Sequence, residues 1–150
     1  MLIGRQAEIR EIHRYAERDE AQFIAVYGRR RVGKTYLVRE AFDNTFTFYH
    51  TGSYETTLKD QLEQFRISLL KCGLKKCNKL KDWVEAFFKL DELIGQSKDR
   101  HKVIFIDELP WLDTPKSHFI SALEHFWNAW ASARRSLTLV VCGSATSSVR

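Results

Sequence analysis

Apolar residues recur at two different spacings along the first third of the chain. Ile9, Ile12 and Ala16 lie three or four positions apart within residues 6–18, which predicts an amphipathic helix. Residues 22–27 instead form one short apolar run, which predicts a buried strand. The helical spacing returns over residues 34–42, so the segment between this strand and this helix is predicted to be a loop.

The same alternation continues to the end of the chain. Strands are predicted at 45–50, 102–106 and 137–142, and helices at 58–72, from Asp82 onward, and at 117–133. Asp82 is a good N-cap because Glu85 follows three residues later. The helix that it begins is expected to bury Val84, Phe87, Phe88 and Ile94.

Strands that alternate with helices indicate the α/β class. The runs at 102–106 and 137–142 are continuously apolar and rich in branched side chains, as in parallel strands that are covered on both faces. A parallel sheet built from crossover helices binds its ligands at the carboxyl ends of its strands. No internal repeat is visible, and we expect one three-layer α/β/α domain over residues 1–150.

Composition narrows the class of protein. A chain of 150 residues with 44% hydrophobic and 29% charged residues can form one folded core. It has no apolar stretch long enough for a signal peptide or a membrane span, and its three cysteines form no Cys-x-x-Cys pair. These features predict a cytoplasmic protein with reduced thiols. His50, His118 and His125 have no metal-ligand spacing and are interpreted as surface or satisfied helix residues.

The net charge of +5 is concentrated in part between Glu63 and Asp82, where five lysines occur without an acidic residue. These are Lys71, Lys75, Lys76, Lys79 and Lys81. Lysines at a helix end and in a loop are usually solvated and complement the helix dipole. The alternative is a contact with nucleic acid or an acidic protein.

The loop after the first strand has the pattern Gly-x-x-x-x-Gly-Lys-Thr over residues 28–35. Gly28 and Gly33 allow backbone angles at which successive N–H groups can surround phosphate oxygens. Lys34 supplies positive charge for the β- and γ-phosphates, and Thr35 offers a hydroxyl to Mg²⁺. We therefore predict a binding site for ATP, with GTP as the alternative. The full set of predicted nucleotide-binding residues is Gly28, Arg29, Arg30, Arg31, Val32, Gly33, Lys34, Thr35 and Tyr36.

Two adjacent carboxylates follow the strand at 102–106. Because side chains alternate along a strand end, Asp107 is expected to reach the Mg²⁺ shell while Glu108 points toward the attacking water. Glu108 would then act as the general base for attack on the γ-phosphate.

The strand at 137–142 is followed by small polar residues. Ser144 is predicted to contact the γ-phosphate or the lytic water, with Thr146 or Ser147 as substitutes and an ordinary turn as the alternative. Trp111, close behind the carboxylates, could sense the nucleotide state or bind a partner. The aromatic residues within 119–130 are interpreted as core packing.

Four segments together resemble the archaeal-type ATPase family, which belongs with the STAND and AAA+ branches of P-loop ATPases. They are residues 2–9, the phosphate loop, residues 106–111 and residues 142–147. The resemblance implies that residues 28–35 are Walker A, that Asp107 and Glu108 are Walker B, and that Ser144 is sensor 1. It also implies a sheet order of 5-1-4-3-2.

The resemblance also indicates what the chain lacks. Family members continue into a fifth strand, an arginine-finger or second-sensor region and further domains, none of which occurs before Arg150. The Walker A strand would then lie at an exposed edge, so we expect a longer protein or a dimer. Without an arginine finger, the 150 residues are expected to bind ATP but not to hydrolyse it efficiently.

Three functions remain to be compared. The leading one is a Mg²⁺-dependent ATPase that acts as a molecular switch. The second is a nucleotide-gated module that binds nucleic acid through residues 71–81 and Arg29 to Arg31. A small-molecule kinase is disfavoured because a water-activating Glu108 would promote wasteful hydrolysis.

Overall fold

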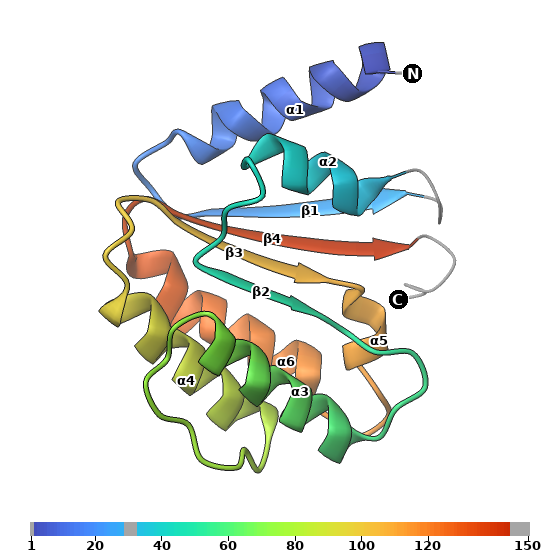
Figure 1. Ribbon diagram of the computed structural model, residues 1–150, viewed down its shortest axis with the longest axis vertical. Coiled ribbons are helices and arrows are strands. Elements are labelled where there is room, and N and C mark those ends of the chain that lie inside the picture. Colours follow the sequence, from blue (N-terminus) through green and yellow to red (C-terminus); the bar gives the residue numbers. More distant parts are fainter. Residues whose placement is uncertain (1, 29–32, 145–150) are drawn as a thin grey trace.

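The computed structural model describes the backbone of residues 2–28 and 33–144, together with all of their side chains except those of residues 2–6, 28 and 144. Helices and strands alternate along the chain (Figure 1). The strands are β1 (Gln22–Gly28), β2 (Phe48–Thr51), β3 (Lys102–Asp107) and β4 (Leu137–Ser144). The helices are α1 (Leu2–Ala16), α2 (Lys34–Ala41), α3 (Leu58–Lys71), α4 (Trp83–Gln96), α5 (Leu109–Leu112) and α6 (Phe119–His125).

The four strands form one parallel sheet in the order β1-β4-β3-β2. In register, Gly28 at the end of β1 lies opposite Ser144 of β4, and Thr51 at the end of β2 lies opposite Asp107 of β3. The order of these four described strands confirms the α/β prediction and agrees with the 1-4-3-2 part of the expected 5-1-4-3-2 sheet.

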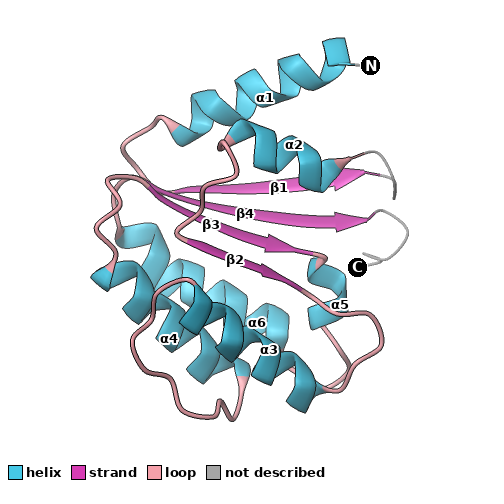
Figure 2. Cartoon of the chain, viewed as in Figure 1, coloured by secondary structure: helices cyan, strands magenta, loops and turns pink. Residues whose placement is uncertain are grey.

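Helices cover the sheet on both faces and give three layers (Figure 2). Alternating side chains of β3 divide the core: Ile104 and Ile106 pack with α3, α4 and α6, whereas Phe105 packs with Val38 of α2. Burial of these apolar side chains away from water is the main force that holds the layers together. Helix α1 packs on α2 and adds Ile12 to the smaller of the two layers.

Local capping fixes where two of the helices begin. Thr57 accepts a hydrogen bond from the backbone N–H of Asp60 at the start of α3. Asp82 accepts one from the backbone N–H of Glu85 at the start of α4, as the sequence predicted. Each cap satisfies an N–H group that has no partner within its own helix.

Two burial predictions were wrong. Val84 is 54% exposed and Phe88 is 55% exposed, although both were expected in the core with Phe87 and Ile94. Val84 and Phe88 lie one turn apart on the outer side of α4, whereas the side that contains Trp83, Phe87 and Leu90 packs in the core. The second error concerns β1, predicted to be buried, because this edge strand leaves Phe23 41% exposed.

Several boundaries differ from the predicted ones. Strand β2 begins at Phe48 rather than at residue 45, because the Thr47 hydroxyl accepts the hydrogen bond that the N–H of Val103 donates. The helix predicted at 117–133 is three pieces: α6, a π-helical turn (η1, Phe126–Trp130) and a 3₁₀ turn (η2, Ala131–Ala133). The short helix α5 was not predicted. Among the helices described, none is both long and apolar enough to cross a membrane.

Candidate functional site

All four strands point the same way, so their carboxyl ends meet at one edge of the sheet (Figure 1). Helix α2 begins at this edge with Lys34, and α5 begins there with Leu109. Parallel α/β sheets bind ligands at this edge. Of the residues that the sequence nominated, those that the structure describes therefore come from three separate parts of the chain to this edge of the sheet.

Gly33 shapes the end of the phosphate loop. Its backbone lies in the left-handed region, with φ 75° and ψ 35°, at the N-cap position of α2. A side chain is disfavoured in this conformation, which explains the glycine. The helix that follows has no acidic residue in its first turn, so its positive N-terminal end suits an anion. Arg29, Arg30, Arg31 and Val32 lie outside the described residues.

Thr35 and Asp107 are brought into direct contact although 72 positions separate them. The Thr35 hydroxyl donates a hydrogen bond of 2.5 Å to Oδ2 of Asp107. Asp107 is only 5% exposed, and its second oxygen, Oδ1, accepts a 2.8 Å hydrogen bond from the backbone N–H of Glu108. The two predicted metal-binding side chains, from α2 and β3, therefore lie in hydrogen-bond contact with each other.

The oxygens of Thr35 and Asp107 fit the hard-donor preference of Mg²⁺, which keeps several waters and binds through one or two carboxylates plus substrate phosphates. Within the part of the chain that the structure describes, no group of three His, Cys, Asp or Glu side chains could hold a metal by itself. An ion at this site would thus depend on phosphate and water for its remaining ligands.

Glu108 does not continue the strand. Strand β3 ends at Asp107, and Glu108 adopts φ 51° and ψ 44°, in the left-handed region, immediately before α5. The alternation of a strand end, from which its direction was predicted, therefore does not apply to this residue. The turn between β3 and α5 sets its orientation instead, and the side chain is half-buried.

The buried thiol of Cys142 is influenced by the charges of three of the predicted site residues. Burial raises the pKa of the Cys142 thiol to about 12, and the negative charge of Asp107 acts in the same direction. The positive charge of Lys34 opposes this rise in the pKa, while Glu108 adds to it. The thiol is therefore neutral at ordinary pH, and the electrostatic influence of Lys34, Asp107 and Glu108 reaches one buried position.

The remaining predicted site residues are Tyr36 and Ser144, with Thr146 and Ser147 as the substitutes for Ser144. Tyr36, in the first turn of α2, is mostly exposed. The side chain of Ser144 lies outside the described residues, as do Thr146 and Ser147, so the sensor role stays a prediction. The backbone of Ser144 lies opposite Gly28 at the end of β1, within the same edge of the sheet.

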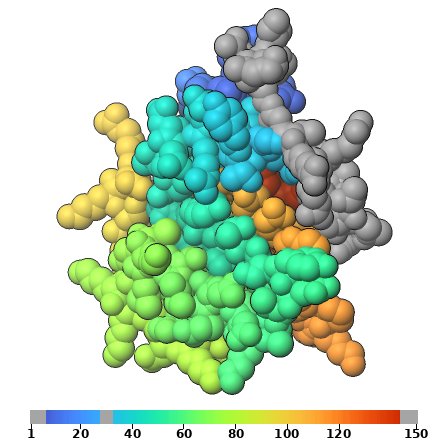
Figure 3. All heavy atoms as spheres, turned by 45° about the vertical axis from the view of Figure 1, so that its right-hand side comes forward, coloured from blue at the N-terminus to red at the C-terminus, as the bar shows by residue number. Residues whose placement is uncertain are grey.

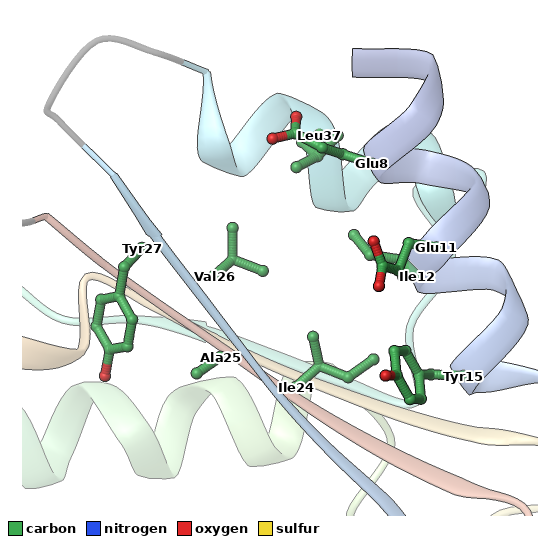
Figure 4. Close-up of a pocket in the computed structure, with 9 residues that line it drawn as sticks. All are labelled: Glu8, Glu11, Ile12, Tyr15, Ile24, Ala25, Val26, Tyr27 and Leu37. Carbon is green, nitrogen blue, oxygen red and sulfur yellow. The ribbon is translucent and has the colours of Figure 1, made fainter. Parts of the chain in front are cut away.

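A separate hollow of about 300 Å³ lies between α1 and β1 (Figure 4). Its walls include the apolar side chains of Ile12, Ile24 and Val26, and Glu8 and Glu11 of α1 also line it. Two carboxylates repel phosphate groups. This hollow is therefore not the phosphate site.

Comparison with known proteins assigns the chain to a family. A family model described as an ATPase domain found predominantly in archaea matches residues 2–150. The chain belongs to this archaeal ATPase family. The chain is thus an ATP-binding, ATPase-type domain. Its four-stranded parallel sheet has the fold of P-loop ATPases.

Two relatives and one solved structure are also similar to this chain. An uncharacterised protein of Methanocaldococcus jannaschii is 27% identical over 147 residues, 98% of this chain and 30% of its own length. An uncharacterised ATP-binding protein of the same organism is 39% identical over 44 residues, 29% of this chain and 75% of its own length. A Walker-type ATPase of Pyrococcus abyssi has a TM-score of 0.59 at 16% identity and covers 93% of this chain.

This archaeal ATPase domain spans only part of its larger relatives. It covers 30% of the first Methanocaldococcus protein and 44% of the solved Pyrococcus chain. At 16% identity, the solved structure supports the fold of the domain and nothing finer.

Sequence reasoning missed a group of residues that borders the site in this ATPase domain. Gln61 of α3 is buried, and its side-chain Nε2 donates hydrogen bonds to the backbone oxygens of Ser53 and Trp111. The sequence does contain a sign of this burial, because Gln61 stands at helical spacing between the apolar residues Leu58 and Phe65. Figure 3 turns the carboxyl edge toward the viewer, where orange residues near 110 adjoin green residues that follow β2.

Trp111 is part of this contact between α5 and the segment after β2. Its ring packs edge-on against the exposed Tyr54, with 4.6 Å between the ring centroids. The predicted roles of Trp111 in sensing nucleotide or binding a partner stay predictions. The geometry does join this tryptophan to the turn that carries Glu108, because its N–H donates to the Glu108 carbonyl.

Proposed function

We propose that this domain hydrolyses ATP to ADP and phosphate in a Mg²⁺-dependent reaction and acts as a molecular switch. The observation that carries the proposal is the 2.5 Å contact between the Thr35 hydroxyl and Asp107. It joins the helix that follows the phosphate loop to the strand that ends at Asp107. P-loop enzymes use a hydroxyl and a carboxylate in this relation to hold Mg²⁺.

Each residue has a distinct task in the proposed reaction. Lys34 and the backbone N–H groups at the start of α2 hold the β- and γ-phosphates, while Thr35 and Asp107 hold Mg²⁺. The metal supplies positive charge that offsets the charge on the phosphate oxygens. Glu108 accepts a proton from the attacking water and orients it in line with the γ-phosphate. Ser144 would contact the same phosphate or the water.

The switch would follow from the loss of the γ-phosphate. Contacts that the γ-phosphate makes with the edge of the sheet exist before hydrolysis and are released after it. Helix α5 is well placed to respond, because it begins immediately after Glu108 and packs against β4. The partner that reads the switch is expected to be a further part of a longer chain, another protein or a second copy.

The test is the substitution Glu108→Gln in the full-length protein. Loss of a general base typically lowers turnover about 10²- to 10⁴-fold, so hydrolysis should nearly disappear while ATP binding is retained. Turnover is measured by phosphate release, and binding by titration with a non-hydrolysable ATP analogue. Glu55→Gln is the matched control, because Glu55 is an exposed glutamate in the segment after β2. Turnover that persists in Glu108→Gln would remove Glu108 as the base.

Nucleic-acid binding is the second candidate function. The observation that favours it is the exposure of all five lysines of the segment 71–81, which contains no acidic residue. Exposed lysines can neutralise the phosphate backbone and release its counterions. The three arginines of the phosphate loop, which the prediction included, lie outside the described residues.

Salt dependence tests this second candidate. If the segment binds nucleic acid, affinity for a duplex should fall steeply with salt, and the logarithmic slope should lose roughly 0.9 for each phosphate contact removed. We expect the triple change Lys75→Glu, Lys76→Glu and Lys79→Glu to reduce the slope more than the same change at the exposed Lys59, Lys98 and Lys116. Equal slopes for the two triple variants, measured by fluorescence anisotropy, would refute a contact at residues 71–81.

A further inference from the structure

We propose that Gln61 is a positioning residue for Glu108 and acts through the backbone of α5. This inference rests on the proposed function, because it takes Glu108 to be the base for ATP hydrolysis. Gln61 lies on α3, outside the residues that would touch ATP or Mg²⁺. It reaches the Walker B turn through the segment after β2 and through Trp111.

Glu108 requires external support because of its backbone. A residue other than glycine is disfavoured in the left-handed region, and this conformation persists where the surrounding structure holds it. Two hydrogen bonds hold this turn: Asp107 Oδ1 accepts from the N–H of Glu108 at 2.8 Å, and the N–H of Trp111 donates to the carbonyl of Glu108 at 3.1 Å. The second bond joins Glu108 to the first turn of α5. The position of Glu108 therefore depends on the position of α5.

Helix α5 is a single turn of four residues, too short to be stable without contacts to other elements. The last carbonyls of a helix have no partner inside it and need one elsewhere. Gln61 supplies one, because its Nε2 lies 3.0 Å from the carbonyl oxygen of Trp111.

The other bonds of the Gln61 amide join α5 to the end of β2. Nε2 donates its second hydrogen to the carbonyl oxygen of Ser53 at 2.8 Å, and Oε1 accepts from the N–H of Ser53 at 3.3 Å. Both donor hydrogens are thus used, and the side chain is only 1% exposed. In such a buried site, leaving a polar group without its partner is costly. Gln61 therefore ties α3, the segment after β2 and α5 into one unit.

Two glycines allow the backbone after β2 and the backbone of β4 to approach the turn at Glu108 and α5 closely. A Cβ atom at Gly52 would lie 2.6 Å from the carbonyl oxygen of Glu108, closer than any real contact. A Cβ atom at Gly143 of β4 would lie 3.3 Å from the ring of Pro110 in α5. The turn that carries Glu108 is therefore enclosed by the ends of β2 and β4, with Gln61 as its polar anchor.

This arrangement predicts a specific kinetic effect. Without the Gln61 amide, the carbonyl of Trp111 loses its anchor and the Glu108 carboxylate samples a wider range of positions. Misplacement of a catalytic group by about 1 Å can cost roughly 10²-fold in rate. ATP binding should change little, because it depends on α2 and the phosphate loop.

The decisive experiment compares Gln61→Met with Gln64→Met in the full-length protein. Gln64 lies on the same helix and accepts a hydrogen bond from the Ser53 hydroxyl, yet within the described residues it makes no bond to α5. In Gln61→Met, we expect kcat for ATP hydrolysis to fall about 10- to 100-fold while KM and the Kd of a non-hydrolysable analogue stay within about threefold. Gln64→Met should retain kcat within about twofold.

A double variant separates positioning from general damage to the fold. In the Glu108→Gln background, Gln61→Met should cause no further loss of kcat, because residues that act as a unit are not additive. If Gln61→Met does not fold, Gln61→Glu carries the same test, because it keeps the size of the side chain but, as a carboxylate, has no hydrogen to donate to the carbonyl of Trp111. It should also lower kcat without raising KM.

The outcomes distinguish the two proposals. A kcat for Gln61→Met equal to that of Gln64→Met, together with a loss of turnover in Glu108→Gln, overturns the role of Gln61 alone. Turnover that is unaffected by Glu108→Gln overturns the proposed function and, with it, the role of Gln61.

Discussion

At the scale of single residues, His50 differs most from its interpretation in the sequence. It was interpreted as a surface or satisfied helix residue, but it lies buried in β2. Its Nδ1 is 2.7 Å from the Ser68 hydroxyl, whereas Nε2 has no hydrogen-bond partner among the described residues. Its ring packs edge-on against Phe65. Burial lowers the pKa of His50 from 6.5 to about 4, so the residue is neutral in the folded protein.

This pKa shift makes stability depend on pH in a defined window. Between pH 6.5 and pH 4 the unfolded chain binds a proton at His50 that the folded chain does not, so the free energy of unfolding decreases as the pH falls. The shift corresponds to a loss of about 3 kcal/mol across this window. We expect His50→Leu to remove that part of the slope in urea denaturation series.

The control for this measurement is His118→Asn. His118 is exposed and has φ 59°, a conformation that asparagine tolerates, so this variant should retain the wild-type slope. A slope that remains unchanged in His50→Leu would show that other groups cause the loss of stability below pH 6.5.

At the scale of elements, α4 shows how packing selects between two apolar faces. The side chains of Phe87 and Phe88 are neighbours in sequence but lie on different faces of the helix. Phe87 is buried against Phe119 and Phe126, whereas Phe88 is exposed apart from an edge-on contact with Trp130. Hydrophobic spacing alone does not reveal which stripe meets the sheet.

A matched pair of substitutions measures this difference. Phe87→Ala should lower the free energy of unfolding by about 3–5 kcal/mol, because it removes a buried ring and leaves a cavity. Phe88→Ala should cost no more than about 1 kcal/mol, since Phe88 is already more than half exposed and loses one aromatic contact, with Trp130. Chemical denaturation gives both values. Equal costs at the two positions would mean that α4 also buries its outer face.

At the scale of the whole molecule, the two helical layers cover the sheet unequally. Helices α3, α4 and α6 pack over β2, β3 and β4, while Phe23 and Tyr27 of β1 remain exposed on the same face. Phe23 meets Trp127 edge-on, which gives its ring partial cover. Edge strands with exposed polar backbone groups are sites for pairing with another chain or segment. Of the two edge strands, β1 is therefore the less covered by helices.

Much of this architecture was predictable from the sequence. Apolar runs located the four strands, and one capping residue, Asp82, located the start of α4. The pattern Gly-x-x-x-x-Gly-Lys-Thr identified the junction between β1 and α2 because it depends on local backbone geometry. These local patterns do not specify the order of strands in the sheet, which only the resemblance to archaeal-type ATPases implied.

Other features could not be predicted because they depend on contacts between distant segments. The bond from Gln61 to Trp111 spans 50 positions, and no helical or strand periodicity predicts such a pair. The left-handed backbone of Glu108 is stabilised by neighbours that gather only in the folded chain. Likewise, α5 is too short to form by itself and depends on tertiary contacts.

The sequence by itself determined the alternation of strands and helices and the residue types for phosphate chemistry, because periodicity, capping and glycine conformations act over a few neighbouring positions. Only the tertiary structure decided how these parts meet. It brought Thr35 against Asp107, chose the buried face of α4 and enclosed the turn at Glu108. These outcomes required the tertiary structure because they minimise exposed apolar surface and unpaired polar groups over the whole chain at once.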